Sequence, residues 1–120
     1  MEDVIDPGPI PYAAIELYGD PDLEHGLRHA GFEPDQTTYR LIDIPLKSIN
    51  DAASMPWPRL GLDLANAIGD GAVLPPIVVM RNYKTWAVRH TWALLDGVNR
   101  TNAYVVLGRE RIRAYEVLQD

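Results

Sequence analysis

The order of apolar and polar positions changes near residue 38. From Tyr39 on, runs of β-branched and aromatic residues alternate with segments in which apolar residues recur every three or four positions. The first pattern is typical of strands and the second of amphipathic helices. The predicted strands are Tyr39–Pro45, Leu74–Met80, Trp86–Arg89, Thr91–Leu95 and Ile112–Leu118, and the predicted helices are Leu60–Ile68 and Arg100–Leu107. These elements predict a compact α+β domain over residues 39–120, with a small mixed sheet and flanking helices.

Residues 1–38 differ from the rest in composition. They hold five of the ten prolines, and the first eleven residues should be extended because proline disfavours helix at its own and the preceding position. A short helix is predicted after Asp20, which would be its N-cap, with Pro21 at the first helical position. This helix should run to about Ala30 and end at Gly31. We expect residues 1–38 to be an N-terminal extension of the domain.

Composition limits the classes of protein that the chain can belong to. Its 120 residues are 47% hydrophobic and 23% charged, which fits one globular domain. The sequence contains no cysteine, which excludes disulfides, thiolate nucleophiles and zinc sites with cysteine ligands. Neither a signal-peptide pattern nor a run of apolar residues long enough to cross a membrane is present. We therefore expect a cytoplasmic protein with no membrane partner.

The charge of the chain argues against binding to duplex DNA. The formal net charge is −6, whereas proteins that bind duplexes usually carry a basic face. The basic residues are scattered until Arg100, Arg109, Arg111 and Arg113. This group is small enough to be a solvated junction between a helix and a strand, so sequence-specific DNA binding is not expected.

The segment Asp96–Thr101 carries the strongest candidate chemistry. A predicted strand ends there, a glycine permits a sharp turn, and a helix begins among small polar residues. The first amides of a helix have no partner within the helix and lie at its positive end, which suits an anion such as phosphate. Arg100 adds donors that match phosphate oxygens, and Asn99 or Thr101 could cap the helix or donate to the ligand. Asp96 could hold a metal-bound water or accept a hydroxyl proton.

The same string also has an ordinary structural interpretation. Asp-Gly is a common turn, Asn99 is a common N-cap, and Arg100 could form a surface ion pair. Taken alone, the six residues favour this interpretation, because junctions between a strand and a helix are frequent.

The segment nevertheless resembles the Asp-Gly-x-x-Arg turn of the ParB/sulfiredoxin superfamily. The stretches Leu62–Ile68 and Gly71–Val79 are similar to the helix, glycine and Pro-Ile-Val-Val strand of the first ParB box. Leu107-Gly108 and the last predicted strand also fall where that family places them. The resemblance spans about Tyr39 to Leu118, and it implies a ParB/sulfiredoxin-like fold whose turn holds nucleotide phosphates. The phosphate-binding residues it implies are Gly97, Val98, Asn99, Arg100 and Thr101.

Several departures from the family pattern restrict what the resemblance implies. Sulfiredoxins have their catalytic cysteine where this chain has Val98, so reduction of sulfinic acids is not expected. ParB proteins that hydrolyse CTP have Glu-Arg-Arg in this turn, of which Arg100 alone is kept here. The free-serine kinases of the family have Asp-Gly-His-x-Arg, and here Val98 replaces the histidine. The ParB helix-turn-helix is also missing from these 120 residues.

Together these observations predict that the chain binds a nucleotide, ATP or CTP, or another phosphorylated ligand. Phosphoryl transfer or hydrolysis could follow, because such reactions need positioned cations more than a covalent nucleophile. In that case Asp96 would be the catalytic residue, orienting Mg²⁺ or acting as a base. One alternative is a non-catalytic interaction module, such as a small regulator or inhibitor of phage or plasmid type, with a protein partner. A second alternative is a toxin-like transferase that uses a nucleotide to modify proteins.

A few further residues are weaker candidates. His25 and His29 lie one helical turn apart and could grip a metal, but no third ligand is evident, so exposed histidines are the simpler interpretation. Arg59 follows a proline-rich loop, and the resemblance to the ParB/sulfiredoxin superfamily implies that it makes a second phosphate contact. Of the aromatic residues, Trp57 could stack on a base, whereas tryptophans in a small domain usually pack in the core. Trp86 and Trp92 are the other tryptophans that could stack on a base. His90 lies in a predicted turn and could approach the phosphate-binding segment if the flanking strands pair as a hairpin.

Overall fold

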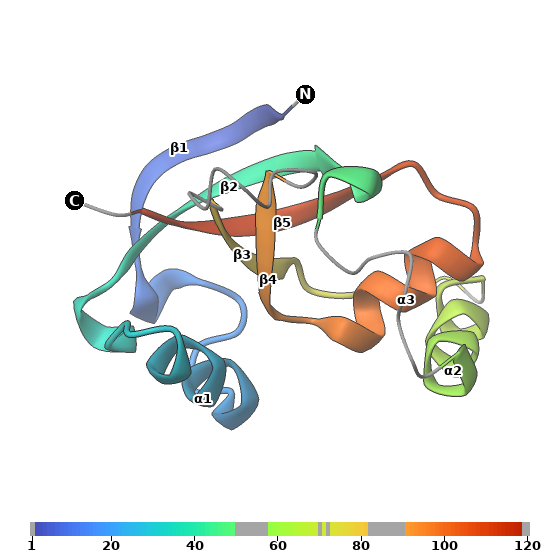
Figure 1. Ribbon diagram of the computed structural model, residues 1–120, viewed down its shortest axis with the longest axis horizontal. Helices are drawn as coiled ribbons and strands as arrows, with labels where there is room; N and C mark the ends of the chain where they lie inside the picture. Colours follow the sequence, from blue (N-terminus) through green and yellow to red (C-terminus); the bar gives the residue numbers. More distant parts are fainter. Residues whose placement is uncertain (1, 50–57, 70, 72, 82–90, 119–120) are drawn as a thin grey trace.

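The computed structural model describes residues 2–49, 58–69, 71, 73–81 and 91–118, and Figure 1 shows its arrangement. Five strands form one sheet in the order β1-β2-β5-β3-β4. The strands are β1 (Asp3–Pro11), β2 (Thr38–Pro45), β3 (Ile77–Arg81), β4 (Trp92–Asp96) and β5 (Arg111–Leu118). The α-helices are α1 (Pro21–His29), α2 (Pro58–Gly69) and α3 (Val98–Val106), and short 3-10 turns are η1 (Tyr12–Ala14), η2 (Pro34–Gln36) and η3 (Leu46–Ser48).

The sheet is mixed, as the sequence pattern predicted. The pairs β1–β2, β2–β5 and β3–β4 are antiparallel, whereas β3 and β5 run parallel. Helices α2 and α3 pack against each other at one end of the sheet, and α1 lies at the other (Figure 1). The predicted α+β class is therefore confirmed. The predicted strand Trp86–Arg89 lies outside the described residues.

Residues 1–38 take part in the same sheet and core as the rest of the chain. Strand β1 extends the sheet at its edge next to β2. Helix α1 begins as predicted, because the Asp20 carboxylate accepts hydrogen bonds from the amides of Asp22 (2.9 Å) and Leu23 (3.4 Å). Its apolar side chains Leu23 and Leu27 are fully buried against the sheet.

Strand β3 begins later than the apolar pattern indicated. The sequence predicted a strand from Leu74, but the strand runs from Ile77 to Arg81. The reason is that Pro75 and Pro76 have no amide hydrogen and cannot donate to a strand ladder. Pairing with β5 therefore starts at Ile77, opposite Ala114.

Each face of the sheet carries its own apolar cluster. On one face, residues of η1 and α1 pack on strand residues, and the buried members are Tyr12, Ile15, Leu17, Leu23, Leu27, Tyr39, Val78, Tyr115 and Val117. On the other face the buried members are Ile42, Ile44, Leu46, Ile49, Ile77, Val79, Trp92, Ile112 and Ala114. Trp92 is thus a core residue, which is the role expected of a tryptophan in a domain of this size.

A row of charged side chains crosses the sheet. It runs from Glu2, just before β1, through Arg40 of β2, Glu116 of β5 and Arg81 of β3 to Trp92 of β4. Arg40 donates to both glutamates, and Arg81 donates to Glu2 at 3.0 Å and 3.1 Å. The Arg81 guanidinium also lies 4.5 Å from the centre of the Trp92 ring, within the range of a cation–π contact. Ion pairs of this row join β2, β5 and β3 to Glu2 before β1, and the cation–π contact adds β4. No sequence pattern predicted this row.

Among the described helices, none combines the length and the hydropathy that a membrane span requires.

Candidate functional site

The turn between β4 and α3 depends on Gly97. Strand β4 ends at Asp96 and α3 begins at Val98, and Gly97 joins them with a φ of +105°, in the left-handed region that favours glycine. A methyl group on Gly97 would lie 2.6 Å from Cγ2 of Ile77 and 2.9 Å from a guanidinium nitrogen of Arg100. Gly97 therefore allows both the turn and the close approach of the Arg100 guanidinium.

The helix begins two residues before the predicted start, which corrects the predicted capping roles. The N-cap is Gly97, which has no side chain to cap the helix, and not Asn99 or Thr101. The amide and the hydroxyl of Thr101 both donate to the Gly97 carbonyl, at 2.8 Å each, and Thr101 is fully buried. Thr101 is therefore occupied within the helix, and it does not line the cavity described below.

The first amides of α3 remain available to a ligand. Within the described part of the chain, no acceptor is paired with the amides of Val98 and Asn99. Because no side chain caps this end of the helix, these two donors add to the positive end of the helix dipole. Both residues are exposed and line a cavity.

Arg100 lies beside these amides but already has an acidic partner. Its terminal nitrogen donates to the Asp96 carboxylate at 3.0 Å and lies 3.4 Å from the Pro76 carbonyl. Both charged side chains are largely buried, at 16% and 12% exposed. Arg100 Nε is also buried and has no acceptor among the described residues, so the guanidinium retains a spare donor.

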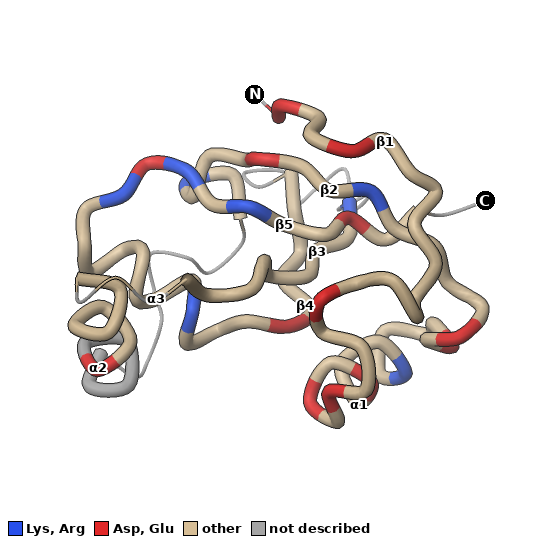
Figure 2. Tube along the Cα trace, turned by 180° about the vertical axis from the view of Figure 1, so that it is seen from behind, with Lys and Arg blue, Asp and Glu red and all other residues tan. Residues whose placement is uncertain are grey.

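The cavity next to α3 has a volume of about 440 Å³. Its walls come from the start of α1, the segment before β3, the β4–α3 junction and α2, and its lining residues are Asp20, Asp22, Leu64, Leu74, Pro75, Leu95, Asp96, Gly97, Val98, Asn99 and Arg100. Figure 2 shows acidic positions at the end of β4 next to those of α1. Among the described residues, three aspartates and one arginine therefore border the cavity, so the charge of this lining is net negative.

The acidic surroundings change the protonation of Asp96. Burial raises the pKa of its carboxyl group, and the nearby charges of Asp20 and Asp22 act in the same direction. Arg100 opposes this effect, but the net pKa remains above the ordinary value. Asp96 is therefore easier to protonate than an exposed aspartate. A raised pKa of this kind is common among carboxylates that act as general bases.

Sequence reasoning missed Asp20 and Asp22, which lie more than 70 positions before the turn. They reach the cavity because α1 packs closely on β4 at Gly26, where a methyl group would lie 2.4 Å from the Leu95 carbonyl oxygen. A glycine in the middle of a predicted helix is the one sequence signal of such a close approach.

Among the described residues, none of the other sequence candidates lines the cavity. Arg59 lies in α2, but its side chain is outside the described part, as are Trp57, Trp86 and His90. The rings of His25 and His29 stack with centroids 6.3 Å apart. Over the described residues, no group of three or more histidine or acidic side chains is placed to hold a metal ion.

Comparisons with known proteins find similar folds. No protein-family model and no curated protein matches the sequence. Sulfiredoxin from Arabidopsis thaliana is similar at 22% identity and a TM-score of 0.48, covering 63% of this chain and 82% of that one. A Pnob8-like ParB-N domain is similar at 17% identity and a TM-score of 0.49, covering 71% of this chain. The match spans 32% of the length of that ParB chain.

At these identities and TM-scores the similarity says nothing of the chemistry of the cavity, which depends on the cavity's own residues.

Proposed function

We propose that the protein binds the phosphate group of a nucleotide, such as ATP or CTP, or of another phosphorylated ligand at the start of α3. One observation carries the proposal: the unpaired amides of Val98 and Asn99 and the guanidinium of Arg100 border the same cavity. Amides at a helix start and an arginine fork are the donors that phosphate oxygens prefer. The spare Nε of Arg100 further supports an anionic ligand.

The carboxylates of the cavity determine how such a ligand would bind. Asp96 is the present partner of Arg100, and a phosphate would replace it as the acceptor. With Asp20 and Asp22 nearby, a bare polyanion is repelled, so Mg²⁺ bound to the nucleotide would strengthen binding. Because the described residues do not form a metal site of their own, Mg²⁺ would enter with the nucleotide. Phosphoryl transfer or hydrolysis with Asp96 as base is an extension of this proposal.

The first test is Arg100→Ala, measured by isothermal titration with ATP, CTP and ADP, each with and without Mg²⁺. We expect the wild-type protein to bind at least one of these ligands and the variant to bind it about tenfold or more weakly, because a charge-assisted hydrogen bond is lost. Arg109→Ala is the matched control, since Arg109 is exposed and lies outside the cavity. No binding by the wild-type protein, or equal loss in both variants, would count against the proposal.

A second test uses Asp96→Asn and inorganic sulfate, whose charge is constant over the pH range of folded proteins. Sulfate should bind the wild-type protein more tightly as the pH falls toward the raised pKa of Asp96, because protonation releases Arg100 and removes a repelling charge. Asp96→Asn should bind sulfate more tightly than wild type at neutral pH and should lose this pH dependence. Weaker binding by Asp96→Asn at neutral pH would show that Asp96 does not compete with the anion.

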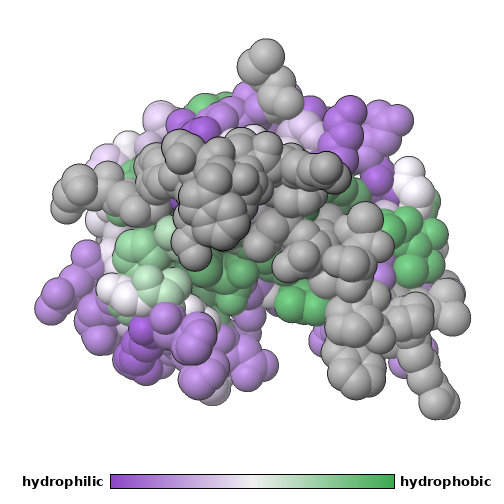
Figure 3. Space-filling view, viewed as in Figure 1, coloured by the Kyte–Doolittle hydropathy of each residue, from purple (hydrophilic) through white to green (hydrophobic). Residues whose placement is uncertain are grey.

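The second candidate function is a non-catalytic interaction module, and the outer face of α3 favours it. Val98, Val105 and Val106 are exposed on this helix, at 41%, 39% and 43%, and Leu107 follows them at 37%. Figure 3 shows apolar surface at the end of α3. A protein partner that covers the end of α3 would protect the amides of Val105, Val106 and Leu107 from hydrogen exchange, whereas a phosphate ligand would protect those of Val98 and Asn99.

A further inference from the structure

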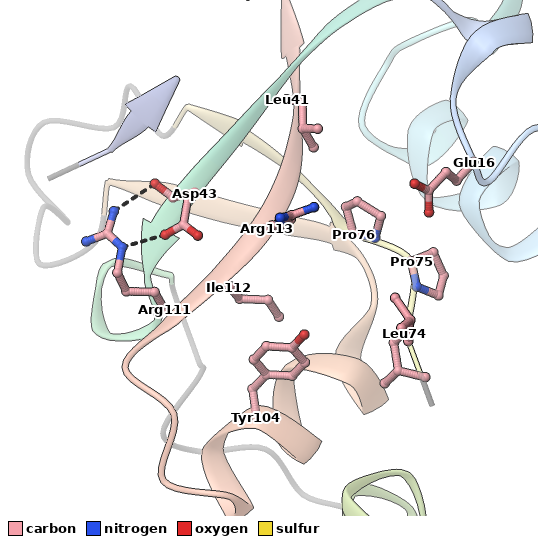
Figure 4. Close-up of a pocket in the computed structure, with 11 residues that line it drawn as sticks. Glu16, Leu41, Asp43, Leu74, Pro75, Pro76, Tyr104, Arg111, Ile112 and Arg113 are labelled. Atoms are coloured by element: carbon pink, nitrogen blue, oxygen red, sulfur yellow. Dashed lines mark hydrogen bonds and ion pairs between the residues drawn. The ribbon is translucent and has the colours of Figure 1, made fainter. Parts of the chain in front are cut away.

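A second cavity opens on the other side of the segment Leu74–Pro76 and has a volume of about 340 Å³. It exists because β3 pairs with β5 only from Ile77 on, where the two prolines end the ladder. The segment Arg111–Arg113 pairs with β2 on one side. On the side that faces β3 it therefore borders open space among the described residues. Figure 4 shows this space between β5, α3 and the proline segment.

Besides Asp43 and Arg111, three polar groups from three different segments of the chain border this cavity. They are the guanidinium of Arg113 from β5, the hydroxyl of Tyr104 from α3 and the carboxylate of Glu16 from the loop after η1. Within the described residues, none of these side-chain groups has a hydrogen-bond or ion-pair partner. The neighbouring Arg111 differs, because it pairs with Asp43 and with Asp3.

The walls between these groups are apolar. Leu41, Ile112, Leu74 and Pro76 line the cavity, and Ile112 and Pro76 are buried. Cavities of about this size, apolar with a few convergent polar groups, are typical of sites for small organic ligands. The polar groups offer a fork of cationic donors at Arg113 and an acceptor at Glu16.

We propose that this cavity binds a small organic anion with an apolar body, whose carboxylate or phosphate pairs with Arg113. The apolar body packs on Leu41, Ile112 and Pro76, and a donor at its far end bonds to Glu16. Tyr104 donates its hydroxyl to the anionic group. The site is separate from the start of α3, since the two cavities share only Leu74 and Pro75 in their linings.

The test uses 3-(4-hydroxyphenyl)propionate as the probe and its neutral amide as the matched compound. Binding is followed in the full chain by the backbone ¹H–¹⁵N shifts of Tyr104, Ile112 and Arg113. We expect saturable shifts at these residues and about tenfold weaker binding of the amide, because the ionic hydrogen bond to Arg113 is lost. Arg113→Gln should weaken binding of the propionate to a similar extent.

Two control variants make the result specific. Arg109→Gln removes an exposed arginine outside this cavity and should leave binding of the propionate unchanged. Arg100→Ala should also leave it unchanged, so failure of the phosphate site and failure of this site can be told apart. The proposal is overturned if the three amides do not shift up to the solubility limit of the probe, or if Arg113→Gln binds as well as the wild-type protein.

Discussion

Replacement of Gly97 by alanine should lower the free energy of unfolding by about 2–4 kcal/mol, measured by chemical denaturation. Alanine is strained at a φ of +105°, and its methyl group would lie 2.6 Å from Ile77 and 2.9 Å from Arg100. Ile77 is fully buried, so it cannot move without disturbing the core. The displaced guanidinium should also weaken any phosphate binding at the start of α3.

Two further variants separate the causes of this loss. Gly97→Asn tolerates a positive φ better than alanine but keeps the clash, so it should also be strongly destabilised. Gly69→Ala, at the end of α2 with no atom within 4 Å of the added methyl group, should be as stable as the wild-type protein or slightly more so. A Gly97→Ala variant within about 0.5 kcal/mol of wild type would contradict the close approach of Ile77 and Arg100.

Glu116→Ala should be the second strongly destabilised variant, by about 2–3 kcal/mol. The Glu116 side chain is 9% exposed, accepts a hydrogen bond from Arg40 and lies 4.0 Å from Arg81. When the Glu116 carboxylate is removed, Arg40 and Arg81 share the single carboxylate of Glu2. One positive charge is then left without a partner in the row, where the side chains are mostly buried. Thermal and chemical denaturation would measure the loss.

The matched control is Glu33→Ala, which removes an ion pair with Arg28 whose side chains are 53% and 49% exposed. An exposed pair contributes little, so this variant should be nearly as stable as the wild-type protein and clearly more stable than Glu116→Ala. The double variant Arg40→Met with Glu116→Leu should lose less than Glu116→Ala, because neither charge is left unpaired. Equal effects of Glu116→Ala and Glu33→Ala would show that the row across the sheet contributes no more than a surface ion pair.

Local patterns predicted the elements well where each one depends on its own residues. Asp20 caps α1 as expected, and the alternation in Tyr39–Pro45 predicted a strand that the structure extends by one residue, from Thr38 to Pro45. The predicted element boundaries were wrong where contacts with another part of the chain determine them. Residues 74–76 were predicted to belong to a strand. Pairing with β5 requires backbone amides that donate hydrogen bonds, and Pro75 and Pro76 have no amide hydrogen. The sequence predicted that α3 starts at Arg100, with Asn99 or Thr101 as a polar cap. In the structure Gly97 is the N-cap and the helix starts at Val98.

The candidate site shows the same division. The turn, its glycine and its arginine are consecutive in the sequence and were predicted together. The partner of Arg100 was not predicted, although a surface ion pair was considered, because pairing with Asp96 in a buried place depends on the packing of β3 and α3. The acidic residues of α1 were not predicted either, because they approach through space.

The sequence by itself determined the approximate positions of the three helices and of β2 to β5, and that a glycine turn with a following arginine begins the last helix. These features follow from interactions between residues close along the chain. For β1 the sequence predicted extended backbone but not its place in the sheet. The tertiary structure decided the charge of the cavity beside that turn, the row of ion pairs that joins Glu2 to β2, β5 and β3, and the gap next to Arg113. Each of these joins residues from separate elements, and the free energy of such contacts depends on distances that packing of the sheet and helices sets.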